Sequence, residues 1–438
     1  MLTDSHTEKL DMPRHAIRLA LPLAAGLALA TTLATAGAAQ DTALTRLLVA
    51  NRHPVALSLG ALTGAGGRLL VDSASHARFV LLGEEHGIAE TPRLMQAMLC
   101  ELRTSGFDTF AIEVSPLQGE RLDGMARKPA AVAALNAMIV DWRTAPPFYS
   151  VREERDLLAS AMTAQCARPP MRIWGLDYDV SADRYFLEEL EKLAPKSGRD
   201  AVHRAHLLAD SGFAAVKQGN PSKFFAWSAP DSVFDALRAA FGPTISPRAR
   251  AIIDVFARTA RINRLFLSGD GYQSNLLRSA YLRENFAREF AQAGTKGTTP
   301  RVVFKFGGSH MMRGFNTTNT LDIGTAADVY AEARGERAYH VLVLGGSGTK
   351  AARMNIMKLQ YEPMPSGEID GANLAWLKPA VPDSGWVVFD MQAARGAWLR
   401  RRGPVLTPMQ DRFVHAYDAI VVLTGSTPGT PVPLAATP

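Results

Sequence analysis

The sequence predicts an α/β fold: a mostly parallel central sheet flanked by helices, with a large helical insertion over the carboxyl-terminal edge of the sheet. Two observations lead to this class. Short apolar runs bounded by turn residues recur along the chain and alternate with segments of helical periodicity. Between two of these runs lies a long strand-free region, residues 181–293, with helical periodicity in most of it. We therefore expect residues 41–438 to form a single domain that carries residues 181–293 as the insertion.

Seven apolar runs are expected to form the core strands. The first two, Phe79–Leu82 and Thr109–Val114, are separated by a helical pattern over Thr91–Ser105. Thr91 is a candidate N-cap of this helix, and Pro92 fits its first position. A strand–helix–strand unit of ~35 residues joins parallel strands, so we expect the first strands to be parallel. The other five runs are Arg172–Leu176, Arg301–Phe306, Tyr339–Leu344, Trp386–Phe389 and Ala419–Leu423.

Helical patterns fill much of the chain between these strands. One set, residues 120–166, precedes the third strand. The tail, Gly425–Pro438, is rich in Pro, Thr and Gly and is expected to be poorly ordered. Within the insertion, the clearest helical patterns are Asp183–Leu193, Arg199–Gln218 and Pro247–Phe266.

Residues 1–40 have the order of a secretory signal peptide. Basic residues at Arg14 and Arg18 precede an Ala- and Leu-rich run over 19–30, and small residues follow up to Ala39. An uncleaved anchor helix is the alternative, but this run is short for a span of ~20 strongly apolar residues. We expect cleavage near Ala39 and a periplasmic or secreted protein. No later apolar run is long enough to cross a bilayer, so we expect no membrane contact after cleavage.

The net charge of +6 does not indicate a nucleic-acid-binding protein. The basic residues are scattered, and several arginines between 248 and 264 lie along one expected helix, as on a solvated face. No block of Lys and Arg alternates with aromatic residues as at a nucleic-acid site. The expected partner is a small-molecule substrate, and the sequence leaves the oligomeric state open.

Two cysteines, Cys100 and Cys166, lie on segments expected to be helical, each leading into a core strand. An oxidising compartment permits a disulfide between them. Two free buried thiols are the alternative, and the sequence does not decide between them.

Polar side chains follow four of the expected strands at the point where each strand ends. The carboxyl ends of parallel strands meet at one edge of a sheet, where open α/β sheets bind their ligands, so we expect these side chains to converge. Carboxylates around two histidines suit general acid–base catalysis on water, and they also suit a divalent metal. Each residue singly has a structural explanation, such as a helix cap, but repetition at four strand ends favours a site. The residues are Glu84, Glu85 and His86, then Glu113, then Asp177 and Asp179, and finally His310.

The same segments resemble the erythromycin esterase-like family. The opening Leu-Gly-Glu-Glu-His-Gly at 82–87, with Glu90 after it, resembles that family's first motif. The resemblance covers most of residues 75–345 in order, and it implies an α/β core with helices above a cleft. Relatives of the family include haem-binding uptake proteins and Tiki-type proteins. The later matching segments are Glu113, Ile173–Asp177, Arg278 with Arg283–Phe286, Gly308–Gly314 and Asp322–Gly324.

The resemblance implies a histidine-activated water that opens an ester or lactone. Carried over to this sequence, His86 is the general base, and Glu84 or Glu113 orients and stabilises it. His310 polarises the carbonyl or binds the developing oxyanion. Residues expected on the substrate-binding side are Glu85, Asp177, Arg313 and Arg93.

The sequence departs from the family pattern and leaves three functions open. One residue, where the family has two, separates the first glutamate from the histidine, and Gly307 stands where the family has the first histidine of a His-x-x-His motif. The first function is a hydrolase without a cofactor. The second is a metal-dependent, Tiki-type hydrolase that uses a divalent ion. The third is a non-catalytic protein that binds haem or another small ligand in the same cleft. The ligands of the divalent ion in the metal-dependent hydrolase would be Glu84, His86, Glu113 and His310.

Overall fold

The computed structural model describes residues 43–141, 148–295, 297, 299–355, 360–369, 372–401 and 406–432. The expected signal peptide, residues 1–40, lies outside the described residues. Within the described part of the chain, every helix is too short or too polar to cross a membrane.

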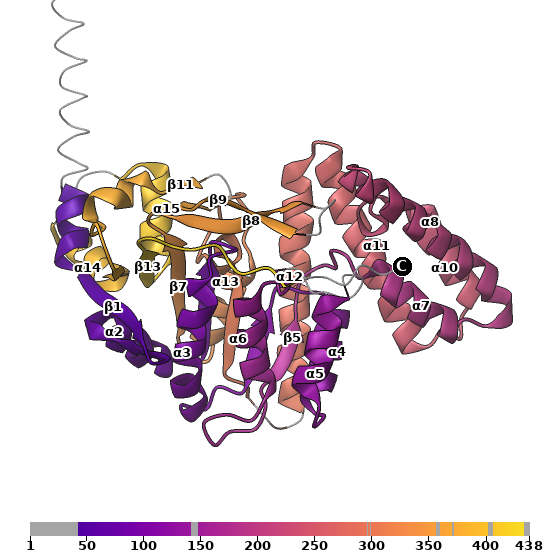
Figure 1. The fold of residues 1–438 in the computed structure, drawn as a ribbon, viewed down its shortest axis with the longest axis horizontal. Helices are drawn as coiled ribbons and strands as arrows, with labels where there is room; N and C mark the ends of the chain where they lie inside the picture. Colours follow the sequence, from indigo (N-terminus) through magenta and orange to yellow (C-terminus); the bar gives the residue numbers. More distant parts are fainter. Residues whose placement is uncertain are drawn as a thin grey trace, which may run out of the picture.

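The core is a nine-stranded sheet in the order β2-β1-β12-β13-β7-β3-β6-β4-β5 (Figure 1). The strands from β13 to β5 are parallel, and β2, β1 and β12 continue the sheet in antiparallel pairing. The α/β fold and the parallel pairing of the first strands are thus confirmed, and all seven expected runs are strands. Their bounds are β3 (Phe79–Glu84), β4 (Thr109–Ile112), β5 (Arg172–Gly175), β6 (Val302–Gly307), β7 (Ala338–Gly345), β12 (Trp386–Asp390) and β13 (Ala419–Leu423).

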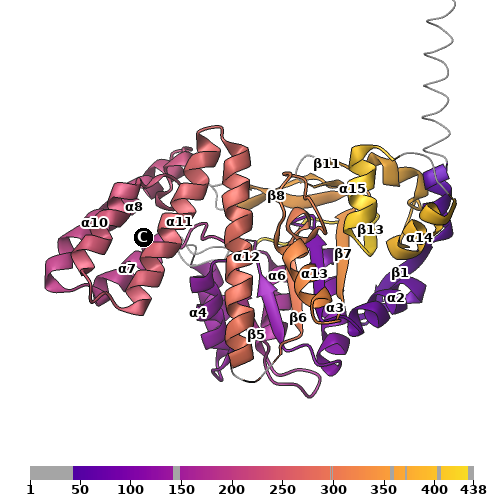
Figure 2. The same ribbon diagram turned by 180° about the vertical axis from the view of Figure 1, so that it is seen from behind.

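Helices cover both faces of the sheet, which explains why its central strands are continuous apolar runs. All six residues of β3 are buried. Phe79 and Leu81 contribute to the apolar cluster on one face, and Val80 and Leu82 contribute to the cluster on the other. Figure 1 shows α3 and α6 in front of the sheet, and Figure 2 shows α12 and α13 on the opposite face. The helices around the core are α2 (Gly64–Ser75), α3 (Glu90–Thr104), α4 (Pro116–Ala126), α5 (Ala131–Val140), α6 (Arg152–Met162), α13 (Ile323–Glu332), α14 (Met391–Arg401) and α15 (Pro408–Ala416), and residues 43–50 are also helical.

The insertion follows β5 and projects beyond that edge of the sheet (Figures 1 and 2). It has an apolar core of its own, which includes Phe186, Phe234 and Phe256. Its last helix, α12, returns along the core and packs Phe286 against Phe79 and Phe304 of the sheet. The helices of the insertion are α7 (Asp183–Leu193), α8 (Arg199–Lys217), α9 (Phe225–Ser228), α10 (Asp231–Phe241), α11 (Pro247–Leu267) and α12 (Gly271–Thr295), with short 3-10 segments at Lys196–Gly198 and Pro221–Lys223.

Some local features differ from the expectations. Helix α3 begins at Glu90, so Thr91 is not its N-cap; the Thr91 side chain is buried inside the first turn. Residues 425–432 of the expected tail hydrogen-bond to residues 87–90 and 150–153; residues 433–438 lie outside the described part. Strands with few apolar residues were not predicted: β1 (Arg52–Ser58), β2 (Ala61–Thr63), β8 (Thr349–Asn355), β9 (Gln360–Pro365), β10 (Glu368–Ile369) and β11 (Ala372–Asn373).

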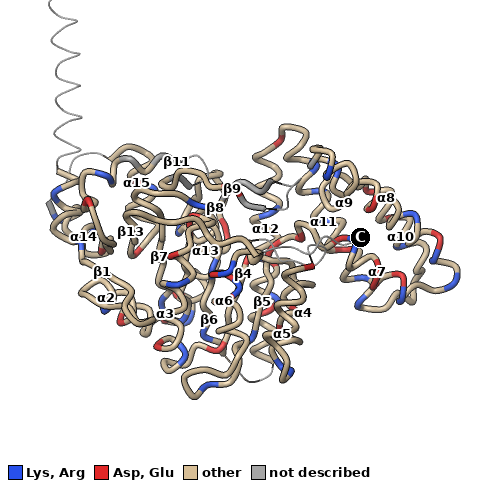
Figure 3. The backbone as a smooth tube through the Cα atoms, viewed as in Figure 1, with Lys and Arg blue, Asp and Glu red and all other residues tan. Residues whose placement is uncertain are grey.

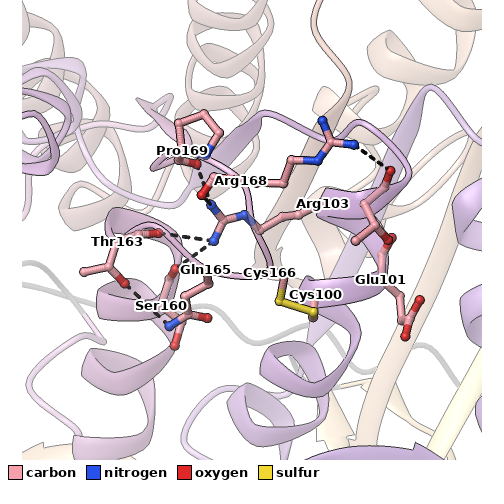
Figure 4. The surroundings of a disulfide bond; sticks show 10 residues. Cys100, Glu101, Arg103, Ser160, Thr163, Gln165, Cys166, Arg168 and Pro169 are labelled. Carbon is pink, nitrogen blue, oxygen red and sulfur yellow. Dashed lines mark hydrogen bonds between the residues drawn. A yellow bond between two sulfur atoms is a disulfide. The ribbon is translucent and has the colours of Figure 1, made fainter.

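Cys100 and Cys166 form a disulfide, with 5.7 Å between their Cα atoms (Figure 4). Cys100 lies on α3, as expected, but Cys166 lies in the loop after α6 rather than on a helix. The guanidinium of Arg103, also on α3, donates to carbonyl groups of the same loop, including those of Thr163 at 3.2 Å and Arg168 at 2.9 Å. A covalent bond and a buried cation therefore hold this loop against α3.

Candidate active site

A cavity of about 260 Å³ lies at the carboxyl ends of β3, β4 and β6, beneath the first half of α12. It contains the two histidines that the sequence analysis singled out. Figure 3 shows that basic and acidic residues are interspersed along both the core and the insertion, so charge alone does not mark this place. A larger groove of about 940 Å³ between α4, β5, α11 and α12 has no histidine among its described lining residues. The smaller cavity is lined by His86, Glu113, Phe148, Asp177, Tyr178, Val180, Asn275, Arg278, Ser279, Gly307, Ser309, His310, Asn316, Thr318 and Asp322.

His86 is held on two sides at the end of β3. In an extended segment, residues i and i+2 lie on the same face, so Glu84 and His86 meet although only one residue separates them. Glu84 Oε1 lies 2.9 Å from His86 Nδ1. The imidazole is stacked on the Phe148 ring, with 3.9 Å between ring centroids and 5° between planes. Nε2, the other ring nitrogen of His86, lies at the cavity and faces Glu113.

Glu113 lies between the two histidines. One carboxylate oxygen is 3.5 Å from His86 Nε2, and the other is 3.6 Å from His310 Nε2. The backbone N–H of Gly307 donates to Glu113 Oε2 at 2.7 Å. A side chain at 307 would place its Cβ 2.9 Å from His86 Nε2, so glycine at this position keeps the space beside the imidazole open.

His310 is oriented by Asp322, just as His86 is oriented by Glu84. Asp322 Oδ2 lies 2.9 Å from His310 Nδ1. The same carboxylate is buried and also accepts from the hydroxyl of Ser279, at 2.8 Å, and from the amide of Asn316, at 3.2 Å. Two histidines, each bonded to a carboxylate, therefore direct their Nε2 atoms toward Glu113 from the chain that follows β3 and the chain that follows β6.

Arg278 of α12 is the main cation of the cavity. Its guanidinium donates to Glu113 Oε1 at 2.9 Å and makes a two-point contact with Asp177 through Nε, at 3.0 Å, and a terminal nitrogen. It also lies over the Tyr178 ring, 4.5 Å from the centroid. From the sequence, Arg278 was only part of a segment that resembles the family and had no expected role, because its partners lie 101 and 165 residues away along the chain.

A buried charge network lies on the other side of Glu84. Lys305, in the middle of β6, donates to Glu84 Oε1 at 2.6 Å and to Glu154 Oε1 at 2.8 Å. Burial raises the pKa of the Glu154 carboxyl to about 7 despite the opposing charge of Lys305. Lys305 and Glu154 were not predicted as site residues, although a lysine inside an otherwise apolar strand was an available signal.

The charges of the cavity set the protonation of its histidines. Burial raises the pKa of Glu113, but His86, His310 and Arg278 outweigh it and hold that pKa at about 2. Burial and Arg278 lower the pKa of His310, yet Asp322 and Glu113 raise it to about 9. Burial also lowers the pKa of His86, but Glu113 and Glu84 raise it above its ordinary value. At neutral pH, Glu113 is therefore ionised and His310 is protonated.

Three residues expected on the substrate-binding side lie elsewhere. Glu85 follows the last residue of β3, is buried, and pairs with Lys350 at 2.8 Å, on the opposite side of the chain from Glu84. Arg93 pairs with Glu153 on α6 at 3.0 Å and is 48% exposed. Arg313 pairs with Asp328 at 2.9 Å and with Asp418 at 3.0 Å. Of that group, only Asp177 lines the cavity; Asp179 accepts from the Ser115 hydroxyl at 2.7 Å and from the Ala182 N–H at 2.8 Å.

One set of residues has metal-ligating geometry. Ligand atoms of Glu113, Asp177 and His310 all lie within 4.8 Å of one another. This set shares Glu113 and His310 with the expected one but contains Asp177 and lacks both Glu84 and His86. Glu84 is bound to Lys305 below the cavity. The Arg278 guanidinium already contacts both carboxylates, so a divalent ion would have to share them with a cation. The residues therefore fit a metal only if Arg278 moves.

The chain matches no protein-family model and no curated protein sequence. Among solved structures, it is similar to a variant of the erythromycin esterase EreC in its open conformation, with 14% identity and a TM-score of 0.52 over 83% of this chain and 95% of that one. It is also similar to a protein from Bacillus cereus, with 15% identity and a TM-score of 0.54 over 89% of this chain and 99% of that one. A third similar structure is that of a succinoglycan biosynthesis protein, with 13% identity and a TM-score of 0.54 over 89% of this chain and 98% of that one. At these identities the likeness shows the fold, which is the erythromycin esterase-like α/β fold.

Proposed function

We propose that this protein is a hydrolase in which His86 activates a water molecule that attacks an ester or lactone carbonyl. One observation carries the proposal: two histidines, each fixed through Nδ1 by a buried carboxylate, face Glu113 across one cavity. The fold supports it as well, since a solved structure with this fold is named as an erythromycin esterase.

His86 is the general base of the proposed reaction. Glu84 accepts a hydrogen bond from Nδ1–H, which keeps the lone pair of the neutral imidazole on Nε2. Nε2 takes a proton from the water as its oxygen attacks the carbonyl carbon. Glu84 and Glu113 then stabilise the imidazolium, which returns the proton to the leaving alkoxide when the tetrahedral intermediate breaks down.

His310 supplies the positive charge that the reaction needs at the carbonyl oxygen. Its pKa of about 9 keeps it protonated at neutral pH, so its Nε2–H can donate to the developing oxyanion. Asp322 holds the ring in place. Arg278 keeps Glu113 and Asp177 in position and offsets their charge.

An ester and lactone panel tests the proposal with wild type, His86→Ala and the matched control His415→Ala. His415 is half-exposed on α15, distant from the cavity in sequence and absent from its lining. We expect His86→Ala to lower kcat by about 10²–10⁴, the usual contribution of a general base, and His415→Ala to leave it unchanged. Turnover of no substrate, or full activity of His86→Ala, would contradict this mechanism.

We also propose that the protein is exported to the periplasm or secreted. The signal-peptide pattern of residues 1–40 and the Cys100–Cys166 disulfide support this, since disulfides persist in oxidising compartments. Expression of the full chain followed by cell fractionation and N-terminal sequencing tests it. A mature N-terminus near Gln40 in the exported fraction is expected; a full-length chain in the cytoplasm would overturn the proposal.

Metal-dependent hydrolysis is the second candidate, favoured by the proximity of Glu113, Asp177 and His310. Metal analysis of the purified protein, with activity measured before and after chelation, distinguishes it from the first candidate. Activity that is lost on chelation and restored by Zn²⁺, Mn²⁺ or Co²⁺ would favour it. Haem binding gains no support from a cavity of about 260 Å³, which is below the ~300–1,000 Å³ typical of sites for drug-sized ligands.

A further inference from the structure

We infer that the substrate of this cavity is an uncharged, hydroxyl-bearing ester or lactone about the size of one sugar ring, and that Asn275 and Tyr178 bind its hydroxyl groups. This inference rests on the proposed hydrolase function and names the substrate class of the same site.

The charged side chains of the cavity indicate whether its ligand carries a charge. Each ionised side chain that faces the cavity already has a partner of opposite charge: His310 pairs with Asp322, and Arg278 pairs with both Glu113 and Asp177. His86 is hydrogen-bonded to Glu84 through Nδ1. A charged substrate would find no unpaired counter-charge among the described lining residues. Burying an unpaired charge is very unfavourable, so this cavity favours an uncharged substrate.

The polar side chains of the cavity differ in whether they already form hydrogen bonds. The hydroxyl groups of Ser279, Ser309 and Thr318 are bonded to neighbouring side chains. The side chains of Asn275 and Tyr178 also line the cavity and are partly exposed, yet they form no hydrogen bond with another described residue.

Their chemistry indicates what they bind. Burial raises the pKa of the Tyr178 hydroxyl, so it stays neutral and can both donate and accept. The amide of Asn275 also donates and accepts. A substrate hydroxyl, which is itself both donor and acceptor, satisfies either group.

The volume of the cavity indicates the size of its ligand. A volume of about 260 Å³ equals that of roughly nine liquid water molecules at ~30 Å³ each. This holds a single six-membered ring with its substituents. Phe148 and Val180 give the cavity an apolar wall for the carbon skeleton of that ring. A macrolide ring would not be enclosed.

Turnover of a matched pair of lactones tests the inference. Glucono-1,5-lactone and δ-valerolactone share the ring and the reactive carbonyl, and only the first has hydroxyl groups. With spontaneous hydrolysis subtracted, we expect kcat/KM to be at least about tenfold higher for the hydroxylated lactone, because a site built to bond hydroxyl groups discriminates against analogues that lack them.

Two variants test the residues themselves. Tyr178→Phe and Asn275→Leu should each lower kcat/KM for glucono-1,5-lactone by about tenfold while leaving kcat/KM for δ-valerolactone nearly unchanged. Tyr272→Phe, at an exposed position of the same helix as Asn275, is the control.

Equilibrium binding separates this inference from the proposed function. Calorimetry with 1,5-anhydroglucitol, which has the ring and hydroxyl groups but no carbonyl, should detect binding that Tyr178→Phe and Asn275→Leu weaken. Glucuronate, which adds a negative charge, should bind more weakly.

Each outcome has a defined meaning. Binding without turnover of any ester or lactone would overturn the hydrolase and keep the ligand class. Turnover without a preference for the hydroxylated lactone, or with a preference for a charged one, would overturn the ligand class and keep the hydrolase. Neither turnover nor binding, in variants that circular dichroism shows to be folded, would overturn both.

Discussion

Glu84, Glu85 and His86 are three consecutive polar residues with two different roles. The alternation of side chains along an extended segment places Glu84 and His86 on one side, where Glu84 holds the ring of His86 beside the cavity, and Glu85 on the other. Glu85 accepts backbone hydrogen bonds from Gly345 and Gly367, both at 2.9 Å from Oε2, and pairs with Lys350. It therefore joins the end of β3 to the last residue of β7, to β8 and to the segment that follows β9.

We predict that Glu85→Gln destabilises the protein without impairing catalysis. Losing the negative charge weakens hydrogen bonds to a charged group, so the free energy of unfolding should fall by about 1–3 kcal/mol. Urea denaturation measures this loss, and kcat measured on the folded variant should match wild type. Reduced kcat/KM at unchanged stability would instead place Glu85 at the substrate.

The two histidines predict a bell-shaped pH profile. His86 must be neutral to accept a proton, so kcat/KM should rise with pH through its pKa, which lies above 6.5. His310 must be protonated to donate, so kcat/KM should fall as the pH passes about 9. Measurement from pH 5 to 11 on the best substrate of the panel tests both limbs.

Asp322→Asn is the matched variant for this profile. Without the carboxylate that raises the pKa of His310, the falling limb should move to lower pH while the rising limb stays in place. A falling limb that does not move would exclude His310 as the group responsible for it.

At the scale of elements, the C-terminal segment 425–432 forms hydrogen bonds with two segments next to the site, residues 87–90 and 150–153. The backbone N–H of Ala89 donates to Thr427 O, and that of Gly429 donates to Gly87 O, both at 2.9 Å. The N–H of Arg152 donates to Thr430 O at 2.8 Å. The segment thus contacts the chain directly after His86 and the chain shortly after Phe148, the two rings that stack.

We predict that truncation after Thr424 lowers both stability and activity. Loosening residues 87–90 and 150–153 would misplace the stacked His86 ring, and a shift of ~1 Å at a catalytic group can cost about 10²-fold in rate. Truncation after Val432, which removes only residues outside the described part, is the control. Equal kcat/KM for both truncated chains would show that the segment does not position His86.

At the scale of the whole molecule, the disulfide closes a loop that includes β4 and α4 to α6. Cys100 and Cys166 are 66 residues apart, and the enclosed segment carries both Glu113 and Phe148. A bond of this kind stabilises mainly by restricting the unfolded chain. Its contribution therefore belongs to global stability rather than to the chemistry of the cavity.

We predict that the double variant Cys100→Ser/Cys166→Ser unfolds with a free energy about 2–4 kcal/mol lower than wild type. Because Arg103 still ties the same loop to α3, the folded variant should keep the kcat of wild type. Urea denaturation of the variant and of wild type with and without a reductant measures the effect. A large loss of kcat in the folded variant would show that the bond also shapes the site.

Most of the core sheet was predictable from the sequence. Strands such as β3 and β7 are buried on both faces and therefore read as continuous apolar runs between turn residues. Strand β1 lies near the edge of the sheet, and only one of its seven residues is buried, so it has no such run. The segment 425–432 looked like a tail because its order comes from backbone hydrogen bonds to distant segments, which composition does not reveal.

What the sequence by itself determined is the order of the core strands along the chain and the polar residues at their carboxyl ends. Apolar runs and strand ends are local features, and His86, Glu113 and His310 follow from them. Only the tertiary structure decided that Arg278, Lys305 and Asn275 belong to the same region and that Glu85, Arg93 and Arg313 do not. The physical reason is that an ion pair or a cavity wall depends on which distant segments pack together, and local periodicity carries no record of that packing.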